Sequence, residues 1–258
     1  MSAYGLTTNT IVPLRREPDD RSEMESQLLF GEHFRIVDKH YQWRKIRNAY
    51  DGYEGWIDEK TFEPVSRETY DKLSSATAFY VADVFSSFQR EDGSVQLLVP
   101  GARLPDYDPE KKTFVINGKT YAFSGEVLTG RQPDDVFFRM AERYRNAPYL
   151  WGGMTPFGID CSGLTQTVFK ITGRYRLPRN ASQQAQHGLR VDFADRQPGD
   201  LAFFVNEKGK IHHVGLVWFE GQILHAHGRV RLDELLPEGI YNRERDEITH
   251  TLVLIRRI

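Results

Sequence analysis

The sequence has 258 residues, of which 40% are hydrophobic and 27% charged, a composition typical of a soluble globular protein. A formal net charge of −2 gives no general attraction for nucleic acid or for an acidic membrane, so we expect neither as a partner. No apolar stretch approaches the roughly 20 residues of a membrane-spanning helix and no secretory leader is evident, which predicts a cytoplasmic protein that we expect to be a monomer.

The first 125 residues are predicted to form short β-strands separated by turns. Residues 42–50 mix aromatic, isoleucine and arginine side chains, reach the turn signal Asp51-Gly52 and continue into a β-prone run. A second hairpin is predicted around Asn117-Gly118, because both residues tolerate a positive φ and β-prone runs flank them. Two small β-barrels are the simplest interpretation of this region, and one continuous β region also fits the pattern.

From Gln132 onward the pattern changes to helices followed by strands. Pro133 can start a helix with apolar residues on one face, and a second helix is predicted from Cys161 to a stop at Gly173. Strand-like runs follow at 201–205, 211–219, 223–226 and 252–255, with a tight turn at Glu220-Gly221. A helix packed on an antiparallel sheet predicts an α+β domain over residues 129–258.

Cys161 is the single cysteine of the chain, which excludes an internal disulfide and argues against a cysteine-based metal cluster. A lone thiol is typical of a reducing compartment, and it is also what a catalytic nucleophile looks like. The alternative is a buried structural cysteine that behaves as a small hydrophobic residue.

The position of Cys161 favours a reactive thiol. Asp160 is a plausible N-cap, which would place Cys161 in the first turn of its helix. The unpaired N–H groups and the dipole at a helix N-terminus lower a thiol pKa, so we expect a lowered pKa for Cys161. Ser162-Gly163 would keep bulk away from the sulfur and allow a substrate carbonyl to approach.

Four of the eight histidines lie in one short region of the sequence: His212, His213, His225 and His227. His213 and His225 are on two predicted strands joined by a tight turn, so strand pairing could bring them together. One of them could accept the thiol proton while the other orients its imidazole ring. The alternatives are polar residues at strand ends or a metal site. Two histidines without nearby carboxylates or further thiols make a poor zinc site, so we expect no metal and no cofactor.

Several motifs, in their order along the chain, resemble the NlpC-type cell-wall cysteine peptidases. The segments similar to the nucleophile region of that family are Tyr149-Leu150-Trp151-Gly152-Gly153 and Gly158-Ile159-Asp160-Cys161-Ser162-Gly163-Leu164. The segments similar to its later motifs are Pro198-Gly199-Asp200-Leu201, His213-Val214-Gly215 and Leu224-His225-Ala226. The resemblance covers about residues 130 to 258. It implies a papain-like α+β fold that hydrolyses peptide bonds in bacterial cell-wall stems.

The resemblance also implies roles for individual residues. Cys161 would be the nucleophile, His213 the general base and His225 the group that orients it. The residues implied to contact the substrate are Tyr149, which would help to stabilise the oxyanion, and Asp160 and Ser162, which would line the cleft. His212 is next to the base but points to the other face of an extended strand, so it is left out of the site.

The N-terminal part carries a second resemblance. Tyr53-Glu54-Gly55-Trp56-Ile57 is similar to the closing strand of bacterial SH3-like domains, and we assign such domains to residues 1–66 and 67–128. Their combination with the catalytic domain resembles γ-D-glutamyl-L-diamino acid endopeptidases, also called dipeptidyl-peptidase VI. These enzymes cut peptidoglycan-derived peptides with a free L-alanine amine and release L-Ala-D-Glu. Tyr53 would match a tyrosine that reaches over the cleft toward the amine.

One position departs from that subgroup, which has Pro-Arg-Asp where this chain has Pro178-Arg179-Asn180. The aspartate is expected to pair with the substrate ammonium, whereas Asn180 brings a hydrogen-bond acceptor without a charge. The expected consequence is either weaker binding of the amine or a relaxed demand for a free amine. The alternative is that Asn180 simply caps a helix that begins near Ala181.

Two other functions fit parts of the sequence. A wall-peptide binding protein would use its SH3-like domains and carry a degenerate catalytic domain, but Cys161, His213 and His225 are all present. An acyltransferase would pass the thioester on Cys161 to an amine or a lipid instead of water. We expect a cysteine peptidase that acts in the recycling of cell-wall peptides.

Overall fold

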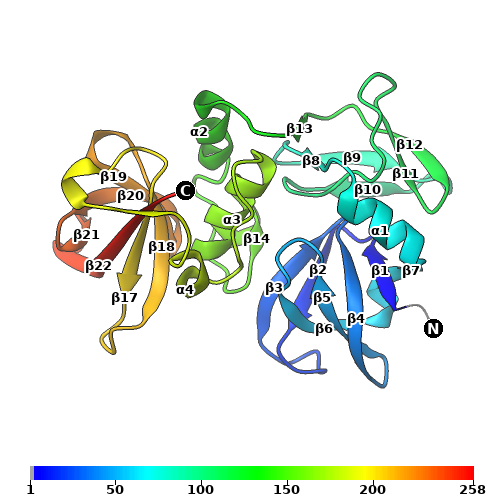
Figure 1. Cartoon of the computed structure of the whole chain (residues 1–258), viewed down its shortest axis with the longest axis horizontal. Helices are drawn as coiled ribbons and strands as arrows, with labels where there is room; N and C mark the ends of the chain where they lie inside the picture. The colour runs from blue at the N-terminus through cyan, green and yellow to red at the C-terminus, as the bar shows by residue number, and fades with distance from the viewer. Residues whose placement is uncertain (1–2) are drawn as a thin grey trace. The chain divides into compact units, whose positions relative to one another are not determined.

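The computed structural model describes residues 3–258, which form two compact units (Figure 1). The first unit contains the chain up to Gln132 together with Ile171–Gly173, and the second contains Pro133–Lys170 and Arg174–Ile258. The boundary between the units is therefore close to the start of the predicted catalytic domain at residue 129. Within residues 3–258, none of the helices has the length and apolar character needed to cross a membrane.

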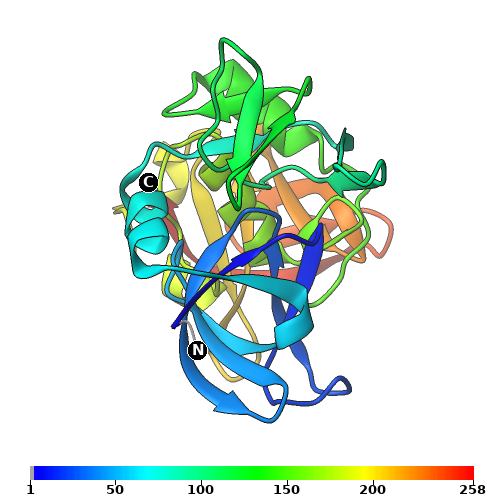
Figure 2. The same ribbon diagram turned by 90° about the vertical axis from the view of Figure 1, so that its right-hand side faces the viewer.

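The first unit begins with a seven-stranded antiparallel sheet of order β3-β2-β6-β5-β4-β1-β7. Its strands are β1 (Tyr4–Thr7), β2 (Ile11–Arg15), β3 (Met24–Leu29), β4 (His33–His40), β5 (Trp43–Asn48), β6 (Glu54–Asp58) and β7 (Phe62–Val65). The 3₁₀ turn η1 (Glu59–Thr61) lies between the last two strands. The blue strands of this sheet curve strongly (Figure 2). Their small apolar core contains Leu14, Phe34 and Ile46. The predicted Asp51-Gly52 turn joins β5 to β6, and Gly52 has a φ of 72°.

The remainder of the first unit consists of a helix and three two-stranded ribbons. These elements are α1 (Arg67–Ser75), β8 (Phe79–Val81), β9 (Ser86–Gln89), β10 (Val95–Leu98), β11 (Thr113–Ile116), β12 (Lys119–Ala122) and β13 (Val127–Thr129). The predicted Asn117-Gly118 hairpin joins β11 to β12, with positive φ at both turn residues. Leu6 of β1 and Phe30, in the turn after β3, share one apolar cluster with Phe114 of this region. The two β regions therefore pack as one unit, and a domain boundary at residue 66 stays a prediction.

The second unit combines helices with an antiparallel sheet. The helices and the short ribbon between them are α2 (Asp134–Glu142), β14 (Met154–Thr155), β15 (Gly158–Ile159), α3 (Cys161–Ile171) and α4 (Ala181–Gln184). The strands and 3₁₀ turns are β16 (Leu189–Val191), η2 (Phe193–Asp195), β17 (Leu201–Val205), β18 (Ile211–Val217), η3 (Phe219–Gly221), β19 (Gln222–His227), β20 (Arg229–Leu236), β21 (Gly239–Asn242) and β22 (Glu247–Arg257). Both predicted helices are confirmed, and all four predicted strand runs lie mainly within strands of this sheet.

The sheet of the second unit closes on itself. Its order is β16-β22-β17-β18-β19-β20-β21, and β22 also pairs with β21, so six strands form a ring. Successive side chains along a strand point to opposite faces, which gives the sheet two apolar cores. Phe203 and Leu224 pack with helix residues on the outer side, whereas Phe204 and Ile223 pack inside the ring. The alternation that places Ile223 inside the ring also places His225 there.

Candidate active site

Helix α3 presents the thiol at its first residue, as the sequence predicts. Asp160 precedes the helix, and its Oδ1 atom accepts a hydrogen bond of 2.7 Å from the backbone N–H of Gly163. This bond makes Asp160 the N-cap of α3. Gly163 has no room for a side chain, because a Cβ there would lie 2.4 Å from the carbonyl oxygen of Gly153. The start of the helix, and with it the position of Cys161, is therefore fixed by local packing.

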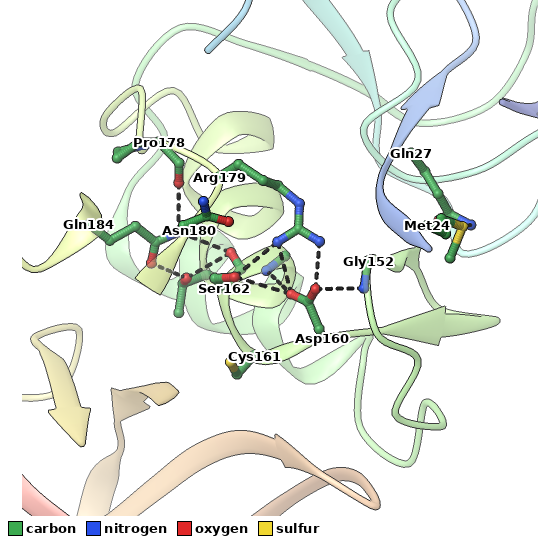
Figure 3. A network of polar contacts seen from close by, with 12 residues as sticks. Met24, Gln27, Gly152, Asp160, Cys161, Ser162, Pro178, Arg179, Asn180 and Gln184 are labelled. Carbon is green, nitrogen blue, oxygen red and sulfur yellow. Dashed lines mark hydrogen bonds and ion pairs between the residues drawn. The ribbon is translucent and has the colours of Figure 1, made fainter. Parts of the chain in front are cut away.

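A buried ion pair holds the N-cap in place (Figure 3). The guanidinium of Arg179 donates from Nη1 to Oδ1 of Asp160 at 3.0 Å and from Nη2 to Oδ2 at 2.5 Å. The backbone N–H of Gly152 donates to the same Oδ2 atom at 2.9 Å, and Arg179 Nη1 also reaches the Ser162 hydroxyl at 2.9 Å. Arg179 is only 2% exposed, so removing one partner would leave a buried unpaired charge at a cost of about 3–5 kcal/mol.

Asp160 and Ser162 are thus engaged in the structure of the helix start. Both side chains are buried, and the Ser162 hydroxyl lies 3.2 Å from Oδ1 of Asp160. Their predicted contact with substrate stays a prediction. Arg179 was not predicted as a site residue, although the Pro178-Arg179-Asn180 motif contained the signal.

The thiol of Cys161 is buried against the backbone of β18. Its Sγ atom lies 4.0 Å from the carbonyl oxygen of His212, and the backbone N–H groups of Val214 and Ser162 lower its pKa. Burial and, second, the negative charge of Asp160 outweigh them and raise the pKa of the thiol to about 12. The expectation of a lowered pKa is therefore wrong for this substrate-free site, because burial has a larger effect than the N–H groups that favour the thiolate.

His213 and His225 meet across neighbouring strands. Nε2 of His213 lies 2.9 Å from Nδ1 of His225, and both rings are buried. In the β18–β19 pairing His225 is opposite Gly215, which places His213 on the diagonal. Gly215 leaves the space that this diagonal contact needs, because a Cβ there would lie 3.0 Å from Cβ of His225 and 2.6 Å from Cδ1 of Ile223. The predicted association of the two histidines is confirmed.

A carboxylate extends the pair into a chain of three groups. Nε2 of His225 lies 3.0 Å from Oδ2 of Asp233, and Arg231 donates to the other carboxylate oxygen at 2.9 Å. Burial raises the pKa of Asp233, but the hydrogen bonds from His225 and Arg231 outweigh it and hold that pKa below its usual value. Asp233 is therefore ionised near neutral pH. The sequence prediction missed it because β20, the strand that carries it, was not predicted.

The ionised Asp233 fixes the tautomers of both imidazoles. A carboxylate only accepts hydrogen bonds, so Nε2 of His225 carries its proton and Nδ1 is an acceptor. His213 then donates from Nε2, which leaves its Nδ1 as the nitrogen that can accept a proton from a thiol. Burial and, next, His225 hold the pKa of His213 well below its usual value, so this ring is neutral in the resting site. The arrangement can act as a general base that accepts a proton during attack.

The other predicted site residues occupy different surroundings. Burial and the charges of Cys161 and Asp160 raise the pKa of Tyr149, so its phenol stays a proton donor near the thiol. Asn180 is exposed and is the N-cap of α4, with its backbone N–H 3.3 Å from Oε1 of Gln183. Tyr53 belongs to the first unit and packs on the core of its sheet. The substrate contacts of Tyr149, Asn180 and Tyr53 stay predictions.

One further histidine lies beside the pair. The ring of His250, on β22, is centred 4.2 Å from the ring of His213. One ring nitrogen each of His213, His225 and His250 lie within 4.8 Å of one another, so these three residues could hold a metal ion. His250 is distant from His213 and His225 in sequence, so the sequence alone does not indicate a third histidine at the pair.

A cysteine at a helix N-terminus, buried against the strand that carries an imidazole held by a second imidazole and a carboxylate, is the arrangement expected of a papain-like cysteine peptidase. Comparison with known families agrees. Residues 146–247 match the NlpC/P60 family, and residues 14–61 match the family described as the bacterial dipeptidyl-peptidase Sh3 domain. The second unit therefore contains an NlpC/P60 domain, as its motifs predict.

Two curated relatives and one solved structure are similar to most of the chain. A gamma-D-glutamyl-L-lysine dipeptidyl-peptidase of Bacillus subtilis is 29% identical over 239 residues, which cover 86% of this chain and 79% of the relative. A protein of the same name from Bacillus cereus is 28% identical and covers 84% of this chain and 71% of the relative. The crystal structure of an NlpC/P60 family protein from Bacillus cereus has a TM-score of 0.83 at 22% identity, covering 98% of this chain and 99% of that structure. The predicted α+β fold with SH3-like β structure before the catalytic domain is confirmed.

The protonation state of Cys161 can be measured directly. We expect the free enzyme to contain a neutral thiol at pH 7, because burial raises the pKa of Cys161 to about 12. The ultraviolet absorbance of the thiolate, taken as the difference between wild type and Cys161→Ser, should stay absent from about pH 5 to pH 9, whereas the unfolded chain should titrate near the ordinary value of about 8.5. A thiolate band that is present at pH 7 and lost in His213→Ala would contradict this.

Asp233 is expected to act as a positioning residue for the two imidazoles. Asp233→Asn exchanges a charged hydrogen bond for a neutral one, a loss of about 1–2 kcal/mol, so kcat should fall about tenfold with little change in KM. The pH profile of kcat should also shift, because the substitution removes the negative charge that favours a protonated imidazole pair. Glu234→Gln removes a neighbouring half-buried carboxylate that pairs with Arg243 and not with the histidines, and serves as the control. An unchanged kcat and pH profile in Asp233→Asn would remove Asp233 from the site.

Proposed function

We propose that this protein hydrolyses the γ-D-glutamyl-L-diamino acid bond of peptidoglycan stem peptides that have a free N-terminal L-alanine, and releases L-Ala-D-Glu. The observation that carries the proposal is the chain of His213, His225 and Asp233 on the strands beside Cys161. The relatives named gamma-D-glutamyl-L-lysine dipeptidyl-peptidase support the substrate class, because their similarity extends over most of the chain.

The reaction follows from the protonation states of the site. Sγ of Cys161 attacks the γ-carbonyl carbon of D-glutamate while Nδ1 of His213 accepts the thiol proton. The negative charge then moves to the carbonyl oxygen, where the Tyr149 phenol is a candidate donor. The C–N bond breaks as His213 returns its proton to the leaving amine of the diamino acid. Water, deprotonated by His213, then hydrolyses the thioester and regenerates the thiol.

The imidazolium that forms on His213 in this cycle is stabilised by the hydrogen-bonded chain that begins at its Nε2 atom. His213 becomes positively charged in a buried site, where an isolated charge is unfavourable. Its Nε2–H donates to His225, which in turn donates to the ionised Asp233. The carboxylate therefore offsets the new charge through two hydrogen bonds. This arrangement lets a neutral resting pair become charged only while the substrate is being attacked.

The proposed substrate also implies where in the cell the enzyme acts. We propose that small free peptides are the substrates, as in the recycling of wall-derived peptides inside the cell, because the requirement for a free amine excludes stems still joined to glycan. Attachment of the stem to glycan converts the L-alanine amine to an amide, which has no positive charge.

The substrate assignment is tested by product analysis. The peptide L-Ala-γ-D-Glu-L-Lys, with a free or an acetylated N-terminus, is incubated with the enzyme, and the products are identified by mass spectrometry. We expect L-Ala-D-Glu and lysine from the free peptide and far slower cleavage of the acetylated one, with Cys161→Ser as the inactive control. Equal cleavage of both peptides would remove the amine requirement, and the absence of L-Ala-D-Glu would refute the assignment.

Asn180 offers a second test of amine recognition. Asn180→Asp keeps a good helix N-cap and adds the charge that the resembling subgroup has at this position. We expect kcat/KM for the free-amine peptide to rise about tenfold, which corresponds to a gain of about 1–1.5 kcal/mol from a charged hydrogen bond. The acetylated peptide should gain nothing. Asn206→Asp, which adds the same charge at another exposed position of the second unit, is the matched control. An equal gain in both variants would show a general charge effect.

A further inference from the structure

The rings of His213, His225 and His250 form a cluster, and the proposed peptidase reaction does not use His250. His250 comes from β22, on the opposite side of β17 from β18, yet its ring is centred 4.2 Å from that of His213 and 5.6 Å from that of His225. All three rings are buried. Three imidazoles thus converge within the fold.

In two of these rings, one nitrogen is hydrogen-bonded to a group outside the cluster. The other nitrogen of each ring can therefore face the cluster. Nε2 of His225 is bound to Asp233, so its nitrogen on the cluster side is Nδ1, which in the metal-free pair accepts from Nε2 of His213. Nδ1 of His250 lies 2.9 Å from the hydroxyl of Thr249, which leaves Nε2. His213 contributes a nitrogen as well, and the three candidate ligand atoms lie within 4.8 Å of one another.

This set matches the first and second coordination shells of a zinc ion. Neutral imidazole is a preferred zinc ligand, and tetrahedral coordination with Zn–N bonds near 2.1 Å places the nitrogens about 3.4 Å apart. The three candidate nitrogens lie within 4.8 Å of one another, so no pair would have to approach by more than about 1.4 Å to reach that spacing. A carboxylate that accepts the second N–H of a ligating histidine, as Asp233 does for His225, is the usual outer partner of a zinc-bound imidazole.

We propose that His213, His225 and His250 form an inhibitory binding site for Zn²⁺. Zinc would take the place of the proton between Nε2 of His213 and Nδ1 of His225. The neutral His213 ring would then carry its proton on Nδ1, which prevents that nitrogen from acting as a base. Zinc bound in this way stops the enzyme without a zinc–sulfur bond, and removal of the ion restores activity.

The binding test uses zinc alone and needs no substrate, so its outcome is independent of the proposed function. Protein treated with a chelator and then freed of it is titrated with Zn²⁺ by isothermal calorimetry, in the Cys161→Ser background to exclude binding by the thiol. We expect one zinc ion per chain. His250→Phe keeps an aromatic ring but removes the ligand, and should weaken the affinity at least about tenfold. Melting temperatures without zinc show whether each variant is folded.

His227→Phe is the matched control, because His227 is on the same strand as His225 and its ring is centred 4.8 Å from that of His250. It lies outside the group of three, so its substitution should leave zinc affinity unchanged. In proteins with Cys161 present, the zinc inhibition constant should rise in His250→Phe by the same factor as the dissociation constant. Loss of zinc binding in Cys161→Ser, equal binding by His250→Phe and its parent, or equal weakening in His227→Phe would each overturn the proposal.

Discussion

The buried ion pair of Asp160 and Arg179 is the interaction on which the active site depends. Two charged groups are removed from water here, and the desolvation is offset only because each carboxylate oxygen accepts several hydrogen bonds. The same carboxylate caps α3, so the pair fixes the residue at which the helix begins. Cys161 is that residue. The nucleophile is therefore positioned by an electrostatic contact that does not itself take part in the chemistry.

Burial has two opposite effects on the catalytic groups. It raises the pKa of the Cys161 thiol and lowers that of the His213 imidazole, so both are neutral before substrate is attacked. It also strengthens the hydrogen bonds that connect His213 through His225 to Asp233, because the local dielectric is low. The site therefore disfavours the charged forms of Cys161 and His213 before attack. During attack, the hydrogen bonds through His225 to Asp233 stabilise the positive charge that forms on His213. The reaction depends on proton transfer at the moment of attack, and Asp233 supplies the balancing charge.

The sequence was informative where the structure is determined by local interactions. The two hairpins at Asp51-Gly52 and Asn117-Gly118 follow from residues that tolerate positive φ, and the start of α3 follows from its N-cap. The pairing of His213 and His225 could be predicted because one tight turn joins their strands. These features each involve a short stretch of chain.

The features that were missed depend on strand order and burial. His250 reaches the cluster only because β22 pairs with β17 in a ring that the sequence does not reveal. Asp233 lies on an unpredicted strand, and Arg179 lies far along the chain from the beginning of α3. The thiol pKa was wrongly expected to be lowered, because the helix N-terminus can be read from sequence whereas the burial of the sulfur cannot. Tertiary packing therefore determined the electrostatics of the site.

The most direct test of the account is the detection of an acyl-enzyme on Cys161. Enzyme mixed with L-Ala-γ-D-Glu-L-Lys is quenched with acid within the first turnover, digested and examined by mass spectrometry. The account predicts that the peptide containing Cys161 gains the mass of one L-Ala-D-Glu acyl group, and that this adduct is absent from Cys161→Ser. An adduct on a different residue, or turnover by Cys161→Ser at the wild-type rate, would contradict it.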